Sequence, residues 1–246
     1  MAEVRTIAVI GAGIMGRGIA HVAALGGYRT ILEDLVPEAL RKAESEIKTN
    51  LDKAVELNKV SSADANATLS RLEYAANVDE AAREADFVIE AVPEEMESKI
   101  EIFTLLDKIC RPGTILASNT SSLSITEIAR VTFRASKCVG MHFFNPVHKM
   151  KLIEVVRAVE TDDETIAAAA DVGRPGKLGG LDSWYDGATL TQLAGIPSVG
   201  FGPPGFDQDG VSLAHIIDEY VPVDGLVRCA QALAVAAMRF CGVSGS

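Results

Sequence analysis

The chain has 246 residues, enough for one large domain or for two modest ones with cores of their own. Hydrophobic residues make up 48% of it and charged residues 23%, which is ordinary for a globular protein and excludes a disordered or fibrous chain. A formal net charge of −11 argues against nucleic acid as a partner, because an acidic surface repels phosphate backbones.

The sequence also lacks the usual marks of a membrane or secreted protein. No run approaches ~18 consecutive apolar residues, and the first residues lack the basic start and apolar core of a signal peptide. The four cysteines are scattered, with no Cys-x-x-Cys pair. We therefore expect reduced thiols, a cytoplasmic location and no membrane partner.

Short β-branched runs alternate with longer amphipathic stretches over the first 170 residues. The expected strands are 6–10, 29–33, 72–75, 87–91, 114–118, 137–142 and 152–156. The expected helices are 14–25, 37–58, 78–84, 94–110, 125–129 and 162–170, and residues 61–69 leave helix and loop unseparated. This alternation predicts an α/β protein with a Rossmann-type, doubly wound and mostly parallel sheet covered on both faces.

The composition changes close to residue 172. Residues 171–180 are rich in Gly and Pro, which should prevent the preceding helix from continuing. Residues 171–246 together hold most of the glycines and the single Trp. We predict a domain of residues 1–172 and a small Gly/Pro-rich tail of residues 173–246. That tail offers one strand (196–201) and one helix (226–240), too little for a core of its own.

A glycine-rich turn follows the first strand and opens the first helix. Its residues are Gly11, Ala12, Gly13, Ile14, Met15 and Gly16. In this context the three glycines allow a tight turn, the approach of a pyrophosphate and close helix packing, and the helix N-terminus attracts the anion. Asp34, at the end of the second strand, would accept the ribose hydroxyls of NAD and repel the 2′-phosphate of NADP, while Glu33 should point the other way. A structural turn with a solvated strand end is the alternative.

Polar residues gather where later strands end. The loop 90–94 should face the cofactor, although Glu94 also suits the first turn of a helix. His142 lies at the end of one expected strand and Glu154 within the next. A His beside a carboxylate can move a proton near neutral pH, as oxidation of a secondary alcohol requires, and Ser121 can help to hold the reacting oxygen. Helix capping and an ordinary buried His are the alternative explanations.

Four stretches carry a resemblance to a known family. They are IAVIGAGIMGRGIA, FVIEAVPEEMESK, SNTSSLSITEIA and HFFNPVHKMKLIEVV. In these, residues 1–172 resemble the NAD-binding domain of the 3-hydroxyacyl-CoA dehydrogenases. The resemblance implies that His142 and Glu154 form a catalytic dyad and that Ser121 contacts the 3-oxygen of the substrate. It also implies that residues around NAD include Glu94, Lys99 and Asn119 together with the glycine turn and Asp34.

The same resemblance implies an enzyme that interconverts L-3-hydroxyacyl-CoA and 3-oxoacyl-CoA with NAD, with CoA engaging residues 37–59. The family continues into a helical domain that closes the acyl site and usually forms the dimer, and this pattern does not follow residue 172. The oligomeric state is therefore left open. An NAD-binding module with little turnover is the alternative function.

The tail resembles a second family, the zinc-dependent acetylornithine deacetylases and succinyl-diaminopimelate desuccinylases. The residues that carry this are DGATLTQLAGIPSVGFGPP, AHIIDEYVPVDGLV and the helix 226–240. The resemblance implies a chimeric chain in which His215 matches the last metal ligand. The other ligands are missing, so we expect no metal site, and a zinc hydrolase is the least favoured function.

Overall fold

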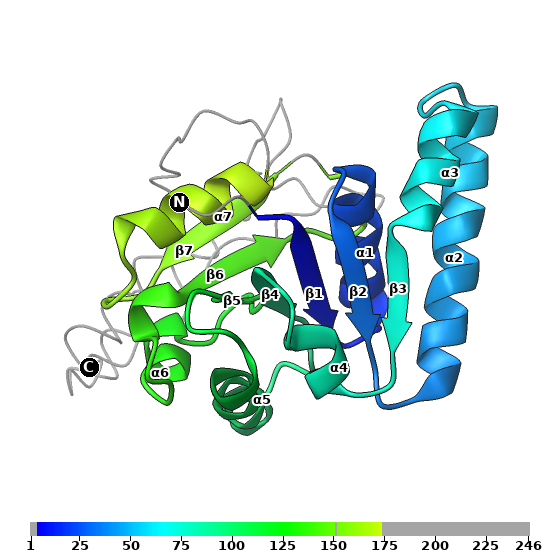
Figure 1. The fold of residues 1–246 in the computed structure, drawn as a ribbon. Coiled ribbons are helices and arrows are strands. Elements are labelled where there is room, and N and C mark those ends of the chain that lie inside the picture. The colour runs from blue at the N-terminus through cyan, green and yellow to red at the C-terminus, as the bar shows by residue number, and fades with distance from the viewer. Residues whose placement is uncertain (1–3, 151, 174–246) are drawn as a thin grey trace, which may run out of the picture. The chain divides into compact units, whose positions relative to one another are not determined.

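The protein is described by a computed structural model that defines residues 4–150 and 152–173. Seven strands form one sheet within these residues, in the order β3-β2-β1-β4-β5-β6-β7 (Figure 1). The strands are β1 Thr6–Ile10, β2 Arg29–Glu33, β3 Leu72–Ala75, β4 Phe87–Glu90, β5 Ile115–Ser118, β6 Cys138–Phe143 and β7 Ile153–Arg157. The helices are α1 Ile14–Leu25, α2 Pro37–Glu56, α3 Ser62–Ser70, α4 Val78–Ala82, α5 Met96–Ile109, α6 Ile125–Ala129 and α7 Asp163–Gly173, with a 3-10 turn at Ala135–Lys137.

The sheet is doubly wound, as predicted. From β1 the chain moves outward through β2 and β3, then returns to place β4 on the other side of β1. All neighbouring strands are parallel except β6 and β7, which are antiparallel. Ligands of such sheets bind outside the carboxyl ends of the strands, at the point where the strand order reverses. Here that point lies between β1 and β4.

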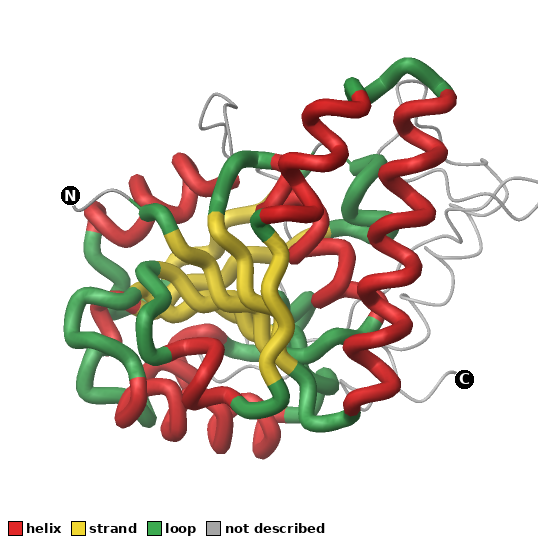
Figure 2. The backbone as a smooth tube through the Cα atoms, turned by 45° about the vertical axis from the view of Figure 1, so that its right-hand side comes forward, coloured by secondary structure: helices red, strands yellow, loops and turns green. Residues whose placement is uncertain are grey.

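Helices cover both faces of the sheet (Figure 2). Side chains of β1 alternate between the two sides, so Ile7 and Val9 pack with α1, α2, α3 and α7, whereas Ala8 and Ile10 pack with α4, α5 and α6. All four side chains are at most 1% exposed. The nearly continuous apolar strands are therefore explained by burial on both faces.

On the α1 face, one helix end differs from the sequence expectation and one unassigned stretch proves to be a helix. α2 ends at Glu56 and not at residue 58, because Asn58 adopts a left-handed backbone with φ of 54°, a common way to end a helix. The unassigned stretch after it forms α3. Ser61 caps this helix, since its hydroxyl accepts a hydrogen bond from the Asp64 N–H.

The expectation that the Gly- and Pro-rich stretch stops the last helix at residue 170 is wrong. α7 continues through Asp171 and Val172 to Gly173. Val172 packs against the cluster on the α1 face, and this tertiary contact supports a turn that local sequence disfavours. The predicted strand 196–201 and helix 226–240 lie outside the described residues.

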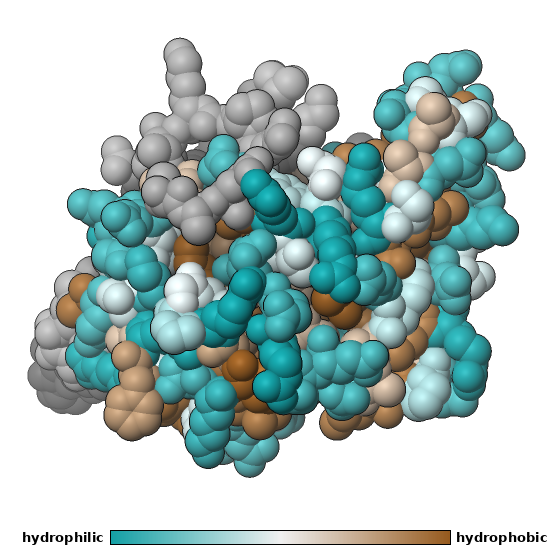
Figure 3. All heavy atoms as spheres, viewed as in Figure 1, coloured by the Kyte–Doolittle hydropathy of each residue, from teal (hydrophilic) through white to brown (hydrophobic). Residues whose placement is uncertain are grey.

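Hydrophilic residues predominate over the helices on the face shown in Figure 3, with apolar residues in small patches between them. No helix in the described ranges is long and apolar enough to cross a membrane.

Candidate functional site

The glycine turn after β1 has the geometry of a phosphate cradle. Gly11 has a φ of 97°, and a side chain there would meet the Ala91 carbonyl oxygen at 2.8 Å. A side chain at Gly16 would overlap the Gly11 carbonyl oxygen at 1.7 Å, so α1 packs directly against the turn. Gly13 differs, because no atom lies within 4 Å of the position that its Cβ would take. Gly13 is also the N-cap of α1 and provides no side-chain cap, so the first N–H groups of α1 are available to an anion.

Asp34 lies directly after β2 and bonds to this turn. Its carboxylate accepts hydrogen bonds from the N–H of Ala12 at 2.8 Å and of Val36 at 2.8 Å. The first bond joins the ends of β1 and β2 and holds the carboxylate beside the cradle. Each oxygen still has a lone pair for a ribose hydroxyl. This arrangement suits NAD.

Glu33, the last residue of β2, has a buried side chain. Its side chain is 2% exposed, and the Oε1 atom is buried without a hydrogen-bond partner. Burial, together with the nearby charge of Asp34, raises the pKa of Glu33 to about 7. The sequence did not indicate that Glu33 would titrate near neutral pH.

The raised pKa of Glu33 predicts a pH-dependent loss of stability. Below pH 4.5, the pKa of Glu33 in the unfolded chain, Glu33 is protonated in both states and its ionisation does not affect stability. Between pH 4.5 and about 7, the unfolded chain loses this proton more readily than the folded protein, so the free energy of unfolding falls. We expect Glu33→Gln to raise the free energy of unfolding by about 2 kcal/mol at pH 8 and by under ~0.5 kcal/mol at pH 4. Urea denaturation at both pH values measures the difference.

A control for this prediction is Glu73→Gln, on the neighbouring strand β3. Glu73 is exposed and paired with Arg29, which lowers its pKa. This variant should not gain stability at pH 8. An equal gain in Glu33→Gln at both pH values would contradict a pKa near 7.

The loop after β4 is bound to the loop after β5 through Glu94. One oxygen of Glu94 accepts hydrogen bonds from the Thr120 hydroxyl at 2.5 Å and the Ser121 N–H at 2.9 Å. Burial acts to raise the pKa of Glu94, but the bonds from Thr120 and Ser121 and the charge of Lys99 lower it overall. Helix α5 begins at Met96, so the expected start at residue 94 is wrong. This oxygen of Glu94 therefore binds the loop after β5 and does not cap the N-terminus of α5.

Lys99 lies in the first turns of α5 and is only 1% exposed. Its ammonium group bonds to Glu90 at 2.7 Å and lies 3.3 Å from Glu94. Glu90 is the last residue of β4, and the sequence placed it in the loop expected to face the cofactor without indicating a role for it. An acid inside the apolar run FVIEAV was the signal that could have found it.

His142 and Glu154 form a close pair. The His142 Nδ1 atom lies 2.8 Å from a Glu154 oxygen, and both side chains are mostly buried. The antiparallel register of β6 and β7 places the two residues directly opposite each other. Asn119 supports this end of β6, because its amide oxygen accepts a hydrogen bond from the Phe143 N–H at 3.0 Å.

The candidate residues therefore lie at one edge of the sheet. The glycine turn, Asp34, Glu94, and Asn119 with Ser121 follow the ends of β1, β2, β4 and β5. His142 lies near the end of β6, and Glu154 near the start of antiparallel β7. Ser121 is exposed at this edge.

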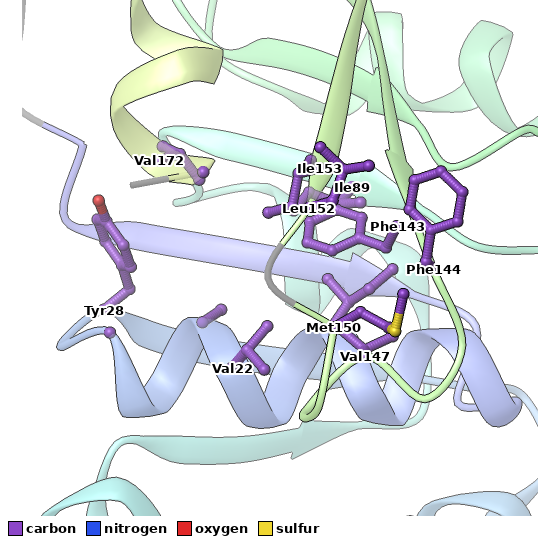
Figure 4. A pocket seen from close by; sticks show the side chains of 14 residues that line it. Val22, Tyr28, Ile89, Phe143, Phe144, Val147, Met150, Leu152, Ile153 and Val172 are labelled. Carbon is purple, nitrogen blue, oxygen red and sulfur yellow. The ribbon is translucent and has the colours of Figure 1, made fainter. Parts of the chain in front are cut away.

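An apolar cavity of about 300 Å³ lies beside this edge, between α1 and the segment that joins β6 to β7 (Figure 4). Val22, Phe143, Phe144 and Met150 point into it, and the Phe144 ring also contacts the His142 ring with centroids 4.6 Å apart. Its described lining has no acid or base other than Tyr28.

A second, more polar hollow of about 230 Å³ lies between α1, α2 and residues 145–148. Arg17 and Asn50 line it, together with the stacked rings of His21 and His148. Burial and the proximity of His148 lower the pKa of His21 to about 4, so His21 is neutral at physiological pH.

The fold and the glycine turn define a dinucleotide-binding α/β domain. Residues 6–177 match the family model of the 3-hydroxyacyl-CoA dehydrogenase, NAD binding domain. The chain belongs to this family, and its cofactor is NAD.

Two curated relatives show the extent of the similarity. A probable 3-hydroxybutyryl-CoA dehydrogenase of Bacillus subtilis is 46% identical over 163 residues, which cover 66% of this chain and 56% of that protein. The 3-hydroxybutyryl-CoA dehydrogenase of Bradyrhizobium diazoefficiens is 41% identical over 177 residues, 72% of this chain and 60% of that protein. The chain thus spans little more than half the length of these relatives.

Solved structures show similarity to the same group of proteins. The crystal structure of 3-hydroxybutyryl-CoA dehydrogenase from Escherichia coli K12 is 40% identical, with a TM-score of 0.68 over 70% of this chain and 36% of that one. The (S)-3-hydroxybutyryl-CoA dehydrogenase from Ralstonia eutropha is 38% identical, with a TM-score of 0.67 over 70% of this chain and 60% of that one. The comparisons do not support the second resemblance, between the tail and zinc-dependent deacylases. Its residues, including His215, lie outside the described residues.

Proposed function

We propose that this chain is an NAD-dependent oxidoreductase that interconverts L-3-hydroxyacyl-CoA and 3-oxoacyl-CoA. The observation that carries the proposal is the 2.8 Å contact between His142 and Glu154, at the same sheet edge as the glycine turn. The names of the relatives, several of them 3-hydroxybutyryl-CoA dehydrogenases, support a short acyl substrate.

The dyad would supply the proton transfer. In the tautomer that donates Nδ1–H to Glu154, the Nε2 atom of His142 carries a lone pair and accepts the proton of the 3-hydroxyl. Glu154 then stabilises the imidazolium and fixes its orientation. NAD, when bound, would supply the acceptor for the hydride of C3. In the reverse direction, the His142 imidazolium returns its proton to the developing alkoxide.

The remaining residues would bind and orient the reactants. The glycine turn, with Ile14 and Met15 at the start of α1, would hold the pyrophosphate, and Asp34 the adenosine ribose. Glu94, Lys99 and Asn119 are proposed to lie around NAD. Ser121 is held by Glu94 and would contact the 3-oxygen. The polar hollow against α2 would accept the CoA arm, which suits the expected role of residues 37–59.

A cytoplasmic location also stays a proposal. Cys110 and Cys138 are buried and unpaired, and burial raises the pKa of both thiols to about 11. Such unreactive thiols fit a reducing compartment.

An assay of NADH oxidation with acetoacetyl-CoA tests the function. We expect turnover with NADH and at least ~10-fold weaker binding of NADPH, because Asp34 would face a 2′-phosphate. A fluorescence titration of NADH runs in parallel. Binding of NADH without any turnover would favour the alternative, an NAD-binding module, and the absence of both would reject the cofactor site in this chain.

A further inference from the structure

We propose that Glu90 is a positioning residue, which orients Lys99 and Glu94 and thereby joins the cofactor loop after β4 to the Ser121 loop after β5. This proposal rests on the proposed function, because its consequence is measured as NADH affinity.

Glu90 is completely buried, and the contacts of its carboxylate account for both oxygens. Oε1 accepts hydrogen bonds from the Lys99 ammonium at 2.7 Å and from the Val92 N–H at 2.8 Å. Oε2 accepts one from the Ser118 hydroxyl at 2.5 Å. Glu90 therefore connects the end of β4, the following loop, α5 and the end of β5.

Lys99 connects buried Glu90 to Glu94, which lies nearer the surface. Its ammonium group lies between buried Glu90 and half-exposed Glu94, with the Val92 carbonyl oxygen at 3.5 Å. The opposite oxygen of Glu94 binds Thr120 and Ser121. The series Glu90, Lys99, Glu94, Ser121 thus passes from the interior to an exposed hydroxyl at the candidate site.

The charges in this series make the proposal testable. Two carboxylates face one ammonium group, and Glu90 is the partner that water does not reach. Without the Glu90 charge, we expect Lys99 to pair with Glu94 alone and to draw that carboxylate away from Thr120 and Ser121. The loops on both sides of the cofactor would then lose their fixed arrangement.

Glu90→Gln separates positioning from simple electrostatics, because the two give opposite signs. Removal of a negative charge near an anionic dinucleotide would by itself tighten NADH binding. Loss of positioning weakens it instead, and we expect a Kd for NADH at least ~10-fold higher. A fluorescence titration measures the change, and an unchanged or lower Kd would overturn the proposal.

A second comparison separates positioning from a merely structural ion pair. Lys99→Met alone leaves Glu90 buried without its cation and should lower the melting temperature sharply. Glu90→Gln with Lys99→Met removes both charges and should recover most of that loss. Positioning predicts that the double variant still binds NADH at least ~10-fold more weakly than the wild type. Recovery of both melting temperature and affinity would overturn it.

Asp107→Asn is the matched control. Asp107 forms a largely buried ion pair with Arg134 at 2.8 Å, on the last turns of α5. The Asp107→Asn variant should have a lower melting temperature and a Kd for NADH within ~2-fold of the wild type.

If Glu90→Gln does not fold, Ser118→Ala provides a milder test, because it removes a single contact of Glu90. It should raise the Kd for NADH by ~3-fold, and no rise would count against the proposal. A wild-type chain that binds no NADH would reject the proposed function as well, whereas binding that is indifferent to Glu90 rejects this inference alone.

Discussion

Gly13→Val should abolish tight NADH binding while the protein stays folded. The backbone of Gly13 has φ of −62° and ψ of −170°, a conformation open to any residue, and no atom lies within 4 Å of the place where a Cβ would stand. The protein itself therefore does not require a glycine at this position. A pyrophosphate over the N-terminus of α1 would meet the new side chain, and we expect the Kd to rise roughly 100-fold, about 2.7 kcal/mol. Fluorescence titration and a melting curve on the same sample measure both quantities.

Gly113→Val is the control for this substitution. Gly113 also has no atom within 4 Å of its Cβ position, but it precedes β5 and so lies at the opposite edge of the sheet. It should leave NADH affinity unchanged. Gly16→Ala, by contrast, should damage folding itself, since its Cβ would lie 1.7 Å from the Gly11 carbonyl oxygen. A Gly13→Val protein that binds NADH normally would show that the turn is only structural.

His142→Ala should reduce kcat by at least ~10²-fold in the acetoacetyl-CoA assay, because a general acid–base group contributes on this scale. Glu154→Gln keeps the shape of the side chain but removes the charge that stabilises the imidazolium, and should lower kcat by ~10-fold or more. Both variants should bind NADH within ~2-fold of the wild type, because neither residue belongs to the glycine turn.

Glu127→Gln controls for the loss of a negative charge. Glu127 is exposed in the first turn of α6 and bonds through its backbone N–H to Ser124, so the substitution should not change kcat. An active enzyme that is indifferent to the changes at both His142 and Glu154 would remove the dyad from the proposed mechanism.

The sequence determined the fold of the first 170 residues and the location of the cradle. Alternating apolar strands and amphipathic helices predict a sheet buried on both faces, since each element must cover its own apolar surface. The glycine turn could be found because its requirements are local. Gly11 has a left-handed backbone, and Gly16 lies against a carbonyl oxygen. Both requirements for glycine arise within a few residues, where one strand ends and one helix begins.

Helix ends and side-chain partners were decided by tertiary structure. α7 continues through Gly173 because Val172 packs against the core, although local preference would end it earlier. Glu94 fits the first turn of a helix by sequence, yet its carboxylate binds Thr120 across two strand ends. The roles of Glu33 and Glu90 are of the same kind. Whether a carboxylate is ionised, paired or left without a partner depends on how much water reaches it and which charges lie nearby, and only the packing of distant segments sets those two quantities.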